Sequence, residues 1–417
     1  MDWPLIMLFY NFIITLLFIL LGPYFLIRLI TKNKDWKWRL GFGKYPQTNK
    51  KKIWIHASSV GEINGLTSLI NKISTEQKDC FVYLSTMTLT GQERAKKIAL
   101  KHHQNIFPFL FPLDIPWIMI IILTKIKPKL LILTETEIWP VLICYAKKMG
   151  CKVLLINARL SERSVKNYKK FQVLFDEVIS KIDLISAQSK TDKDRFRKFG
   201  NRNVKINGNL KFALSLPEFD FDKIKDNWKI KSNFVITFGS SRPKEEELVV
   251  DLHKFLIAQE VKHQIILAPR HLNRLPEVEK LLKANDLNYE KLSEIKSRYD
   301  ILLIDRMGEL TKAYSISNLA VIGGSFYDFG GHNPLEAAYF SKPILMGKFH
   351  QSCRKTVEIL LRYNAIEIVD KDDLNQKIMY LCKHPEIRKK MGNAAKMVME
   401  RNKDSLEKTL KAIERYL

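Results

Sequence analysis

The chain has 417 residues, of which 46% are hydrophobic, and its 69 lysines and arginines outnumber its 44 aspartates and glutamates by 25. A single hydrophobic core stops growing near about 250 to 300 residues, so this length argues against one core and predicts two domains. The positive excess favours a polyanionic partner, either nucleic acid or anionic lipid. The five cysteines show no metal-like CxxC spacing and are odd in number, which indicates reduced thiols.

The first segment, residues 1–30, predicts a membrane anchor. It has no charged residue between Trp3 and Ile27, and it is about as long as a helix that crosses a bilayer. It lacks the basic start and the small-residue cleavage site of a secretory signal. Basic residues follow directly, which places the rest of the chain in the cytoplasm by the positive-inside rule. Gly22-Pro23 leaves open a kinked segment or a monotopic anchor that lies in the membrane interface.

This anchor also distinguishes between the two kinds of polyanionic partner. Basic segments beside a membrane gain roughly 1 kcal/mol per charge from acidic headgroups. We therefore expect the positive surface to contact anionic membrane lipids, and we expect no nucleic-acid partner.

After residue 50, short apolar runs alternate with amphipathic stretches, which is typical of βα units around a parallel sheet. The pattern lapses in a polar, proline-containing linker at residues 213–227 and then restarts. We predict an α/β protein with two Rossmann-like domains, residues 31–212 and 228–417. Ligands of such sheets bind beyond the carboxyl ends of the strands. The apolar runs are Ile53–Ile55, Phe81–Leu84, Leu130–Leu133, Val153–Ile156, Phe234–Phe238, Gln264–Leu267, Ile301–Ile304, Leu319–Ile322 and Ile344–Leu345.

The loop after the first run, His56–Gly65, is a small-residue turn that opens a helix. In one interpretation it only starts the helix, with Ser58 or Ser59 as the cap and Glu62 completing a capping box. In the other, Glu62 is a general base in a cleft between the domains, because a carboxylate there could take a proton from an incoming hydroxyl.

Three later loops of the first half also carry charged residues. Glu135 and Glu137 follow a strand and could bind a sugar or polarise Glu62, although acids at a helix N-terminus are common for dipole reasons alone. Arg159 follows the next strand and suits a carboxylate or phosphate, since guanidinium binds such groups in bidentate fashion. Lys211 stands just before the linker, where it could hold a charged ligand. Surface ion pairs are the alternative for Arg159 and Lys211.

In the second half, the stretch Gly323–Glu336 runs from a buried strand through a glycine-rich turn into a helix. Its glycines allow positive φ and close backbone approach, and Pro334 suits the first turn of a helix. The free N–H groups at that helix start would face an anion, so the stretch predicts a phosphate cradle. Glu336 could cap the helix or bind a ribose diol. A tight turn without a ligand is the alternative.

Three more loops of the second half follow strands, where a nucleotide would lie. The first contains Ser240. In the second, Arg270 could neutralise a phosphate, while the neighbouring His271 is more often a structural residue than a catalytic one. In the third, backbone groups from Met307 to Leu310 could read the edge of a base.

Taken together, these motifs resemble the Kdo transferases, which are inverting GT-B glycosyltransferases that move 3-deoxy-D-manno-octulosonic acid (Kdo) from CMP-Kdo to the lipid A precursor. The resemblance covers nearly the whole chain, and its elements occur in the family's order. They are the N-terminal anchor, His56–Glu62 (HASSVGE), Thr134–Pro140 (TETEIWP), Asn157–Ser164 (NARLSERS), Gly208–Phe212 (GNLKF), Pro269–His271 (PRH), Gly308–Leu310 (GEL) and Gly330–Glu336 (GGHNPLE).

The resemblance implies a GT-B fold in which Glu62 is the catalytic base and Glu135, Arg159 and Lys211 line the donor and acceptor cleft. It implies an acceptor, the lipid A precursor lipid IVA, at the inner membrane during lipopolysaccharide core biosynthesis. CMP-Kdo would be the donor substrate, with no separate cofactor. The residues expected to bind its CMP moiety are Ser240, Pro269, Arg270, Met307, Gly308, Glu309, Gly331, Asn333 and Glu336.

No metal ion is expected. A CMP-activated sugar leaves as a phosphate monoester, whose charge arginine, lysine and helix-end N–H groups can balance. The DxD-like triplets, such as Asp192-Lys193-Asp194, lie in helical or linker contexts. The chain departs from the family's pattern at Ala213, where an Asp is usual, and at Ala337, where a Pro is common, but neither change removes a charge assigned to catalysis.

The sequence leaves two other functions open. One is a GT-B transferase that uses a UDP-sugar in cell-envelope synthesis, although a diphosphate donor would usually demand more cationic help. The other is a membrane-tethered polyanion-binding protein without catalysis, whose binding would depend steeply on salt concentration.

Overall fold

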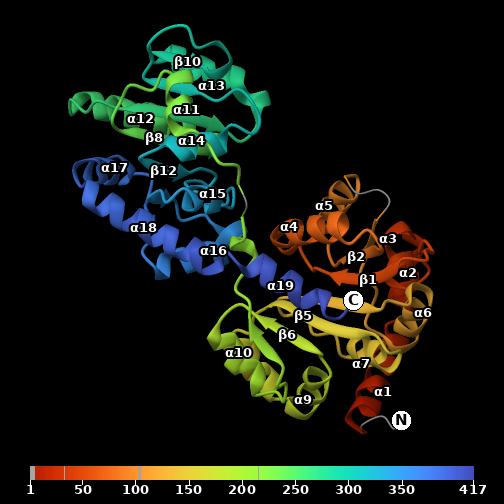
Figure 1. The fold of residues 1–417 in the computed structure, drawn as a ribbon. Coiled ribbons are helices and arrows are strands. Elements are labelled where there is room, and N and C mark those ends of the chain that lie inside the picture. The colour runs from red at the N-terminus through yellow and green to blue at the C-terminus, as the bar shows by residue number, and fades with distance from the viewer. Residues whose placement is uncertain (1–4, 32, 102–104, 215) are drawn as a thin grey trace. The chain divides into compact units, whose positions relative to one another are not determined.

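The computed structural model of the chain describes residues 5–31, 33–101, 105–214 and 216–417. These residues form two compact units (Figure 1). The first unit comprises Met1–Ala213 and Asn402–Leu417, and the second comprises Leu214–Arg401. Each unit contains one seven-stranded sheet in which all pairings are parallel, so the prediction of two Rossmann-like domains is confirmed.

The sheet of the first unit has the strand order β3-β2-β1-β4-β5-β6-β7. Its central strands are continuous apolar runs because helices cover both of their faces. Successive residues of β1 point to opposite faces: Trp54 belongs to one buried cluster, while Ile53 and Ile55 belong to the other. The strands are β1 (Lys51–His56), β2 (Cys80–Thr86), β3 (Ile106–Leu110), β4 (Leu130–Thr134), β5 (Lys152–Ala158), β6 (Leu184–Ala187) and β7 (Val204–Ile206).

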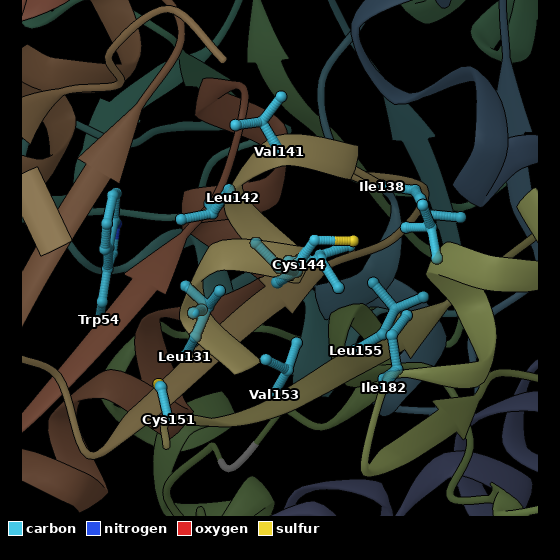
Figure 2. Packing of buried hydrophobic residues seen from close by; sticks show 14 of the residues in the cluster. Trp54, Leu131, Ile138, Val141, Leu142, Cys144, Cys151, Val153, Leu155 and Ile182 are labelled. Atoms are coloured by element: carbon cyan, nitrogen blue, oxygen red, sulfur yellow. The ribbon is translucent and has the colours of Figure 1, made fainter. Parts of the chain in front are cut away.

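Figure 2 shows the first of these clusters, in which side chains of the sheet lie beside those of α7. Leu131 of β4 and Val153 of β5 pack with Leu142 and Cys144 of that helix. The helices of this unit are α1 (Leu5–Leu20), α2 (Gly22–Thr31), α3 (Asn33–Arg39), α4 (Val60–Glu76), α5 (Leu89–Ala99), α6 (Pro116–Ile126), α7 (Pro140–Lys148), α8 (Glu162–Lys169), α9 (Gln172–Ser180), α10 (Lys190–Arg197), the 3-10 helix η1 (Leu210–Phe212) and α19 (Ser405–Glu414).

The expected anchor, residues 1–30, is divided between α1 and α2, and its residues 1–4 lie outside the described part of the chain. Met7 of α1 is fully buried against the core of the first unit, so α1 packs on this unit instead of standing apart from it. Within the described ranges, none of the helices combines the length and apolar character needed to cross a membrane.

The sheet of the second unit has the order β10-β11-β9-β8-β12-β13-β14. Its strands are β8 (Val235–Ser241), β9 (Gln264–Pro269), β10 (Tyr289–Lys291), β11 (Ile301–Leu303), β12 (Leu319–Ile322), β13 (Ile344–Met346) and β14 (Ile366–Ile368). Its helices are α11 (Phe221–Asn227), α12 (Glu245–Ala258), α13 (Leu275–Ala284), α14 (Leu310–Ile316), α15 (Leu335–Tyr339), α16 (Arg354–Arg362), α17 (Leu374–Lys383) and α18 (Pro385–Asn402), with the 3-10 helices η2 (Leu272–Arg274), η3 (Leu292–Glu294) and η4 (Gln351–Cys353).

The unit boundaries differ from the predicted ones at two places. The predicted linker, residues 213–227, contains α11, whose Ile224 is buried with Trp228 in the core of the second unit. The predicted C-terminal domain extended to residue 417, but α19 packs against α4 of the first unit. The reason is an apolar face on α19, where Leu410 and Ile413 join the same buried cluster as Ile63 of α4.

Replacing Ile413 by alanine should destabilise the first unit, because its fully buried side chain would leave a cavity against α4. We expect a loss of about 2 to 5 kcal/mol in the free energy of unfolding, measured as a lower urea midpoint by circular dichroism. Lys411→Ala on the exposed side of the same helix is the control, with an expected change within about 0.5 kcal/mol. Equal midpoints for the two variants would contradict the packing of α19.

Candidate active site

Glu62 lies in the first turn of α4, directly after the loop that follows β1. Ser59 is the N-cap of this helix, and its hydroxyl accepts the Glu62 N–H (3.4 Å). In return, the Glu62 carboxylate accepts the Ser58 N–H (2.8 Å) and the Ser59 hydroxyl (3.2 Å). This is a capping box whose return bond goes to the residue before the N-cap. The structural interpretation of the motif is therefore correct, but it does not account for all contacts of Glu62.

A second strand end also holds Glu62. Thr134, the last residue of β4, donates its hydroxyl to the Glu62 carboxylate at 3.0 Å. Burial raises the pKa of Glu62, and the negative charges of Glu135 and Glu137 raise it further, against hydrogen bonds from Ser58 and Thr134 that lower it. A carboxylate with a raised pKa accepts a proton more readily, which is the property of a general base.

Glu135 follows β4 in the left-handed backbone conformation (φ 51°) and is 5% exposed. Its carboxylate forms an ion pair with Lys211 of η1, with 2.6 Å between the charged atoms. A Cβ atom at Gly65 of α4 would lie 2.7 Å from Cγ of Lys211, so glycine leaves the room that the lysine needs. Asn157 holds η1 in place, because its side-chain oxygen accepts the Leu210 N–H (3.1 Å).

Arg159 belongs to the same site through its backbone. Its N–H donates to the Glu135 carbonyl (3.2 Å), and its own carbonyl accepts the Thr136 hydroxyl (2.9 Å). The structure therefore brings the four predicted residues Glu62, Glu135, Arg159 and Lys211 together near the carboxyl ends of β1, β4 and β5.

The sequence did not identify His56 and Glu137 as a pair. The His56 ring is fully buried, with Nε2 3.3 Å from Glu137 Oε2 and Nδ1 2.9 Å from the Ser85 hydroxyl. The same Glu137 oxygen accepts the indole N–H of Trp139 (2.9 Å). These bonds fix Glu137 near Glu62, whose pKa it raises. The signal was present, since both residues stand in the motifs that carry the family resemblance.

In the second unit, the residues predicted to bind a nucleotide lie at the ends of β8 and β9 and in the loops after β9, β11 and β12. Ser240, predicted to lie in a loop, is the penultimate residue of β8. Ser240 has a left-handed backbone (φ 60°), and its carbonyl oxygen would lie 2.6 Å from a Cβ atom at Gly323, so glycine is required where these strand ends meet. Pro269 is the last residue of β9. Arg270 follows it, donates its N–H to the Ser241 carbonyl (3.0 Å), and exposes its side chain.

The loop before α14 is exposed to solvent, as expected for a segment whose backbone contacts a ligand. Met307 is 74% exposed, and Gly308 has a left-handed backbone (φ 89°). Glu309 forms an ion pair with Lys312 one helical turn later, at 2.9 Å. This segment therefore has backbone groups at the surface and one carboxylate that already has a partner.

At the start of α15, two predicted residues have partners within the second unit. The Asn333 side chain accepts the Leu335 N–H (3.2 Å), and the Glu336 carboxylate accepts the Thr311 hydroxyl of α14 (2.9 Å). Gly331 has a left-handed backbone (φ 73°). Glu336 therefore ties α15 to α14 in this structure, and its predicted bond to a ribose stays a prediction.

The first part of the predicted phosphate cradle is already occupied. Glu245, at the start of α12, is fully buried and accepts the N–H groups of Gly324 (2.6 Å), Ser325 (2.9 Å) and Phe326 (3.0 Å). It also accepts the Arg242 N–H (2.9 Å). These backbone groups form an anion-binding nest, but a carboxylate of the protein fills it. The N–H groups at the start of α15, where the sequence places the anion, are not among these, so the predicted phosphate cradle stays a prediction.

Arg242 and His332 were also missed by the sequence analysis. Arg242 Nη1 donates to Nε2 of His271, and its guanidinium lies over the Phe329 ring, 4.7 Å from the centroid. Burial and the positive charges of Arg270, Arg242 and His271 together lower the pKa of His332 to about 4. Four basic side chains thus gather at the carboxyl ends of β8, β9 and β12.

Across the described ranges, no three His, Cys, Asp or Glu side chains converge so that they could hold a metal ion. Metal-independent activity is not tested by this observation and stays a prediction.

The fold is shared with a solved glycosyltransferase. A glycosyltransferase from Rickettsia africae superposes with a TM-score of 0.50 at 14% identity, over 88% of this chain and 99% of that one. Two Rossmann-like units of this kind define the GT-B class of glycosyltransferases.

The family model for 3-deoxy-D-manno-octulosonic-acid transferase (kdotransferase) matches residues 34–214. A 3-deoxy-D-manno-octulosonic acid transferase of Rickettsia bellii is 33% identical over 96% of this chain and 97% of its own length. The chain belongs to the 3-deoxy-D-manno-octulosonic acid transferase family.

A bifunctional glycosyltransferase/methyltransferase of Fusobacterium nucleatum is 37% identical over 321 residues, 74% of this chain. The match spans about half of that relative, 49% of its length. The predicted family and the predicted enzyme class, a glycosyltransferase, are both confirmed.

Replacing Gly65 by alanine should reduce sugar transfer by roughly ten- to a hundredfold, because the new methyl group would displace Lys211 from Glu135. The unfolding midpoint should also fall, because the buried Glu135 carboxylate loses this ion pair, and the gain of about 1 kcal/mol in helix propensity offsets only part of that loss. Steady-state transfer rates and thermal unfolding measure the two effects. Gly61→Ala in the same helix is the control, because its Cβ atom would meet nothing closer than 3.8 Å. Equal transfer by both variants would show that the position of Lys211 does not matter.

Proposed function

We propose that the protein transfers Kdo from CMP-Kdo to the lipid A precursor lipid IVA, at the inner membrane during lipopolysaccharide core biosynthesis. Family membership supports the transfer of Kdo. The observation that carries the mechanism is the setting of Glu62, which is held by the Ser58 N–H and the Thr134 hydroxyl and has a raised pKa.

In this mechanism Glu62 removes the proton from a hydroxyl of the acceptor. The hydroxyl oxygen forms a bond to the anomeric carbon of Kdo while the bond from that carbon to the phosphate oxygen breaks, so CMP leaves with the bonding electrons. Direct attack from the opposite side inverts the anomeric centre. Glu135 and Glu137 assist because their negative charge raises the affinity of Glu62 for the proton.

The second unit would bind the donor. Arg270 has an exposed guanidinium at the end of β9, where it can neutralise the phosphate of CMP as the leaving charge develops. The exposed backbone from Met307 to Glu309 suits the edge of the cytosine ring. With the charge balanced by arginine and backbone N–H groups, the transfer requires no metal ion.

The lipid acceptor accounts for the apolar N-terminus. Met7 packs into the core, but the opposite side of α1 leaves large apolar side chains in contact with solvent. A helix of this kind suits an anchor that lies in the membrane interface, with the catalytic units in the cytoplasm. The net charge of +25 favours anionic lipids around it. The exposed apolar residues of α1 are Leu5, Leu8, Phe9, Phe12, Ile13, Leu16, Leu17, Ile19 and Leu20.

The function is tested by incubating the full chain with enzymatically generated CMP-Kdo and tetraacylated lipid A precursor in the presence of EDTA. Mass spectrometry of the glycolipid should show one or more added Kdo units, and their number reports how many sugars are transferred. Absence of product from folded protein, together with stronger binding of UDP than of CMP, would instead support a UDP-sugar transferase.

Replacing Glu62 by glutamine should lower the transfer rate by about 10²- to 10⁴-fold, because the amide cannot accept the proton. CMP binding should persist, since the nucleotide is assigned to the second unit. In the unchanged protein, the acid limb of the rate should lie above pH 4.5, the ordinary glutamate value, because the pKa of Glu62 is raised and only its ionised form is active.

Glu76→Gln, at the exposed end of the same helix, is the matched control and should leave both rate and pH profile unchanged. Normal turnover by the Glu62→Gln variant would remove Glu62 from the role of general base.

A further inference from the structure

Arg242, Arg270, His271 and His332 form a cluster of basic side chains in the second unit, here called the cationic cluster. Arg242 contacts His271 directly, and Arg270, Arg242 and His271 all act on the charge of His332. The cluster lies on the loops after β8, β9 and β12, the edge of the sheet where ligands bind.

Within the described ranges, the two arginines of the cluster have no acidic partner. Neither the Arg242 nor the Arg270 guanidinium lies within 4.0 Å of a carboxylate, whereas the neighbouring Arg274 is paired with Glu246 at 2.8 Å. The nearby Glu245 carboxylate is taken up by backbone N–H groups. Positive charges that lie close together without an acidic partner repel one another, so an anionic ligand would stabilise this arrangement.

Two buried atoms of the cluster also have no hydrogen-bond partner among the described residues, namely Nε of Arg242 and Nε2 of His332. Each can donate a hydrogen bond, Nε2 when its nitrogen carries the proton. The pKa of His332 is lowered because a ring that is buried beside two arginines resists a further positive charge. An anion placed here would satisfy both donors and relieve the repulsion.

The protein holds this arrangement in place. The Arg242 N–H is bound to the Glu245 carboxylate, which also binds the loop after β12. Gly324 in that loop has a left-handed backbone (φ 69°), and a Cβ atom there would lie 2.8 Å from Cδ2 of His332. Glycine therefore lets the His332 ring approach the loop. The Arg242 guanidinium rests on the Phe329 ring.

We infer that Arg242 and His332 form a second anion subsite, beside the phosphate site of Arg270, and that this subsite binds the carboxylate of the donor sugar. The inference rests on the proposed function, in which the donor carries both a phosphodiester and a sugar carboxylate. In such a donor the carboxylate and the phosphate oxygen are attached to the same anomeric carbon, so the two anions are close neighbours. Two guanidinium groups that both act on the charge of His332 match two neighbouring anions, and a nucleotide with a neutral sugar would leave one of them unpaired.

The test compares the binding of CMP and of freshly generated CMP-Kdo to the full-length protein by titration calorimetry. Arg242→Gln should weaken CMP-Kdo at least about tenfold and change CMP by less than about twofold. Arg270→Gln should weaken both ligands. Arg242→Lys keeps the positive charge but loses the planar guanidinium group. Its affinity for CMP-Kdo should therefore lie between that of the unchanged protein and that of Arg242→Gln. Arg298→Gln, an exposed arginine of the same unit, is the control and should change neither affinity.

The outcomes separate the inference from the proposed function. If the unchanged protein binds CMP-Kdo but Arg242→Gln loses affinity for neither ligand, or for both equally, the carboxylate subsite is wrong and the donor assignment stands. If the unchanged protein does not bind CMP-Kdo, the donor assignment and the subsite both fail. The thermal unfolding midpoint of Arg242→Gln should equal that of the unchanged protein. A loss of affinity is then due to the missing guanidinium group and not to misfolding.

Discussion

In each unit, one glutamate at the start of a helix joins the two central strands of the sheet, and the geometry of each site depends on that bridge. The order of strands reverses between β1 and β4 in the first unit and between β8 and β12 in the second. Glu62 follows β1 and accepts the hydroxyl of Thr134 at the end of β4. Glu245 follows β8 and accepts three N–H groups from the loop after β12. Loops at such a reversal leave backbone groups without sheet partners, and in both units a carboxylate supplies the partner.

The two bridges differ in burial and in the charges around them, and this difference suits them to different tasks. Glu62 is only partly buried and has two other glutamates nearby, so its affinity for a proton is increased. Glu245 is fully buried and accepts hydrogen bonds from four N–H groups, so it stabilises the backbone of these loops and is not accessible to a substrate. Two further glutamates therefore act on the charge of the first bridge, whereas a cluster of basic side chains lies near the second. In the proposed transfer this separation is useful, because a general base must attract a proton while a donor site must attract negative charge.

The sequence predicted the fold class and most of the functional segments, because these depend on local patterns. Most central strands appear as apolar runs, whereas the edge strands β7 (Val204–Ile206) and β10 (Tyr289–Lys291) have three residues each, too few for an apolar pattern to indicate them. Glu62, Glu135 and Lys211 could be predicted from motifs after strands. Glu245 and Arg242 could not, since their roles come from contacts with segments about 80 residues away or on a different strand. A run of glutamates at a helix start looks the same whether it faces water or fills a nest of N–H groups.

The return of the chain to the first unit has a consequence for how the protein is made. The second unit is continuous in sequence, but the first is completed only by Asn402–Leu417, whose α19 covers part of its core. During synthesis the first 213 residues leave the ribosome with that apolar surface uncovered, and it stays so while nearly 190 further residues are translated. The first unit therefore begins first and finishes last, so a prematurely terminated chain could contain a whole second unit and still lack a complete first one.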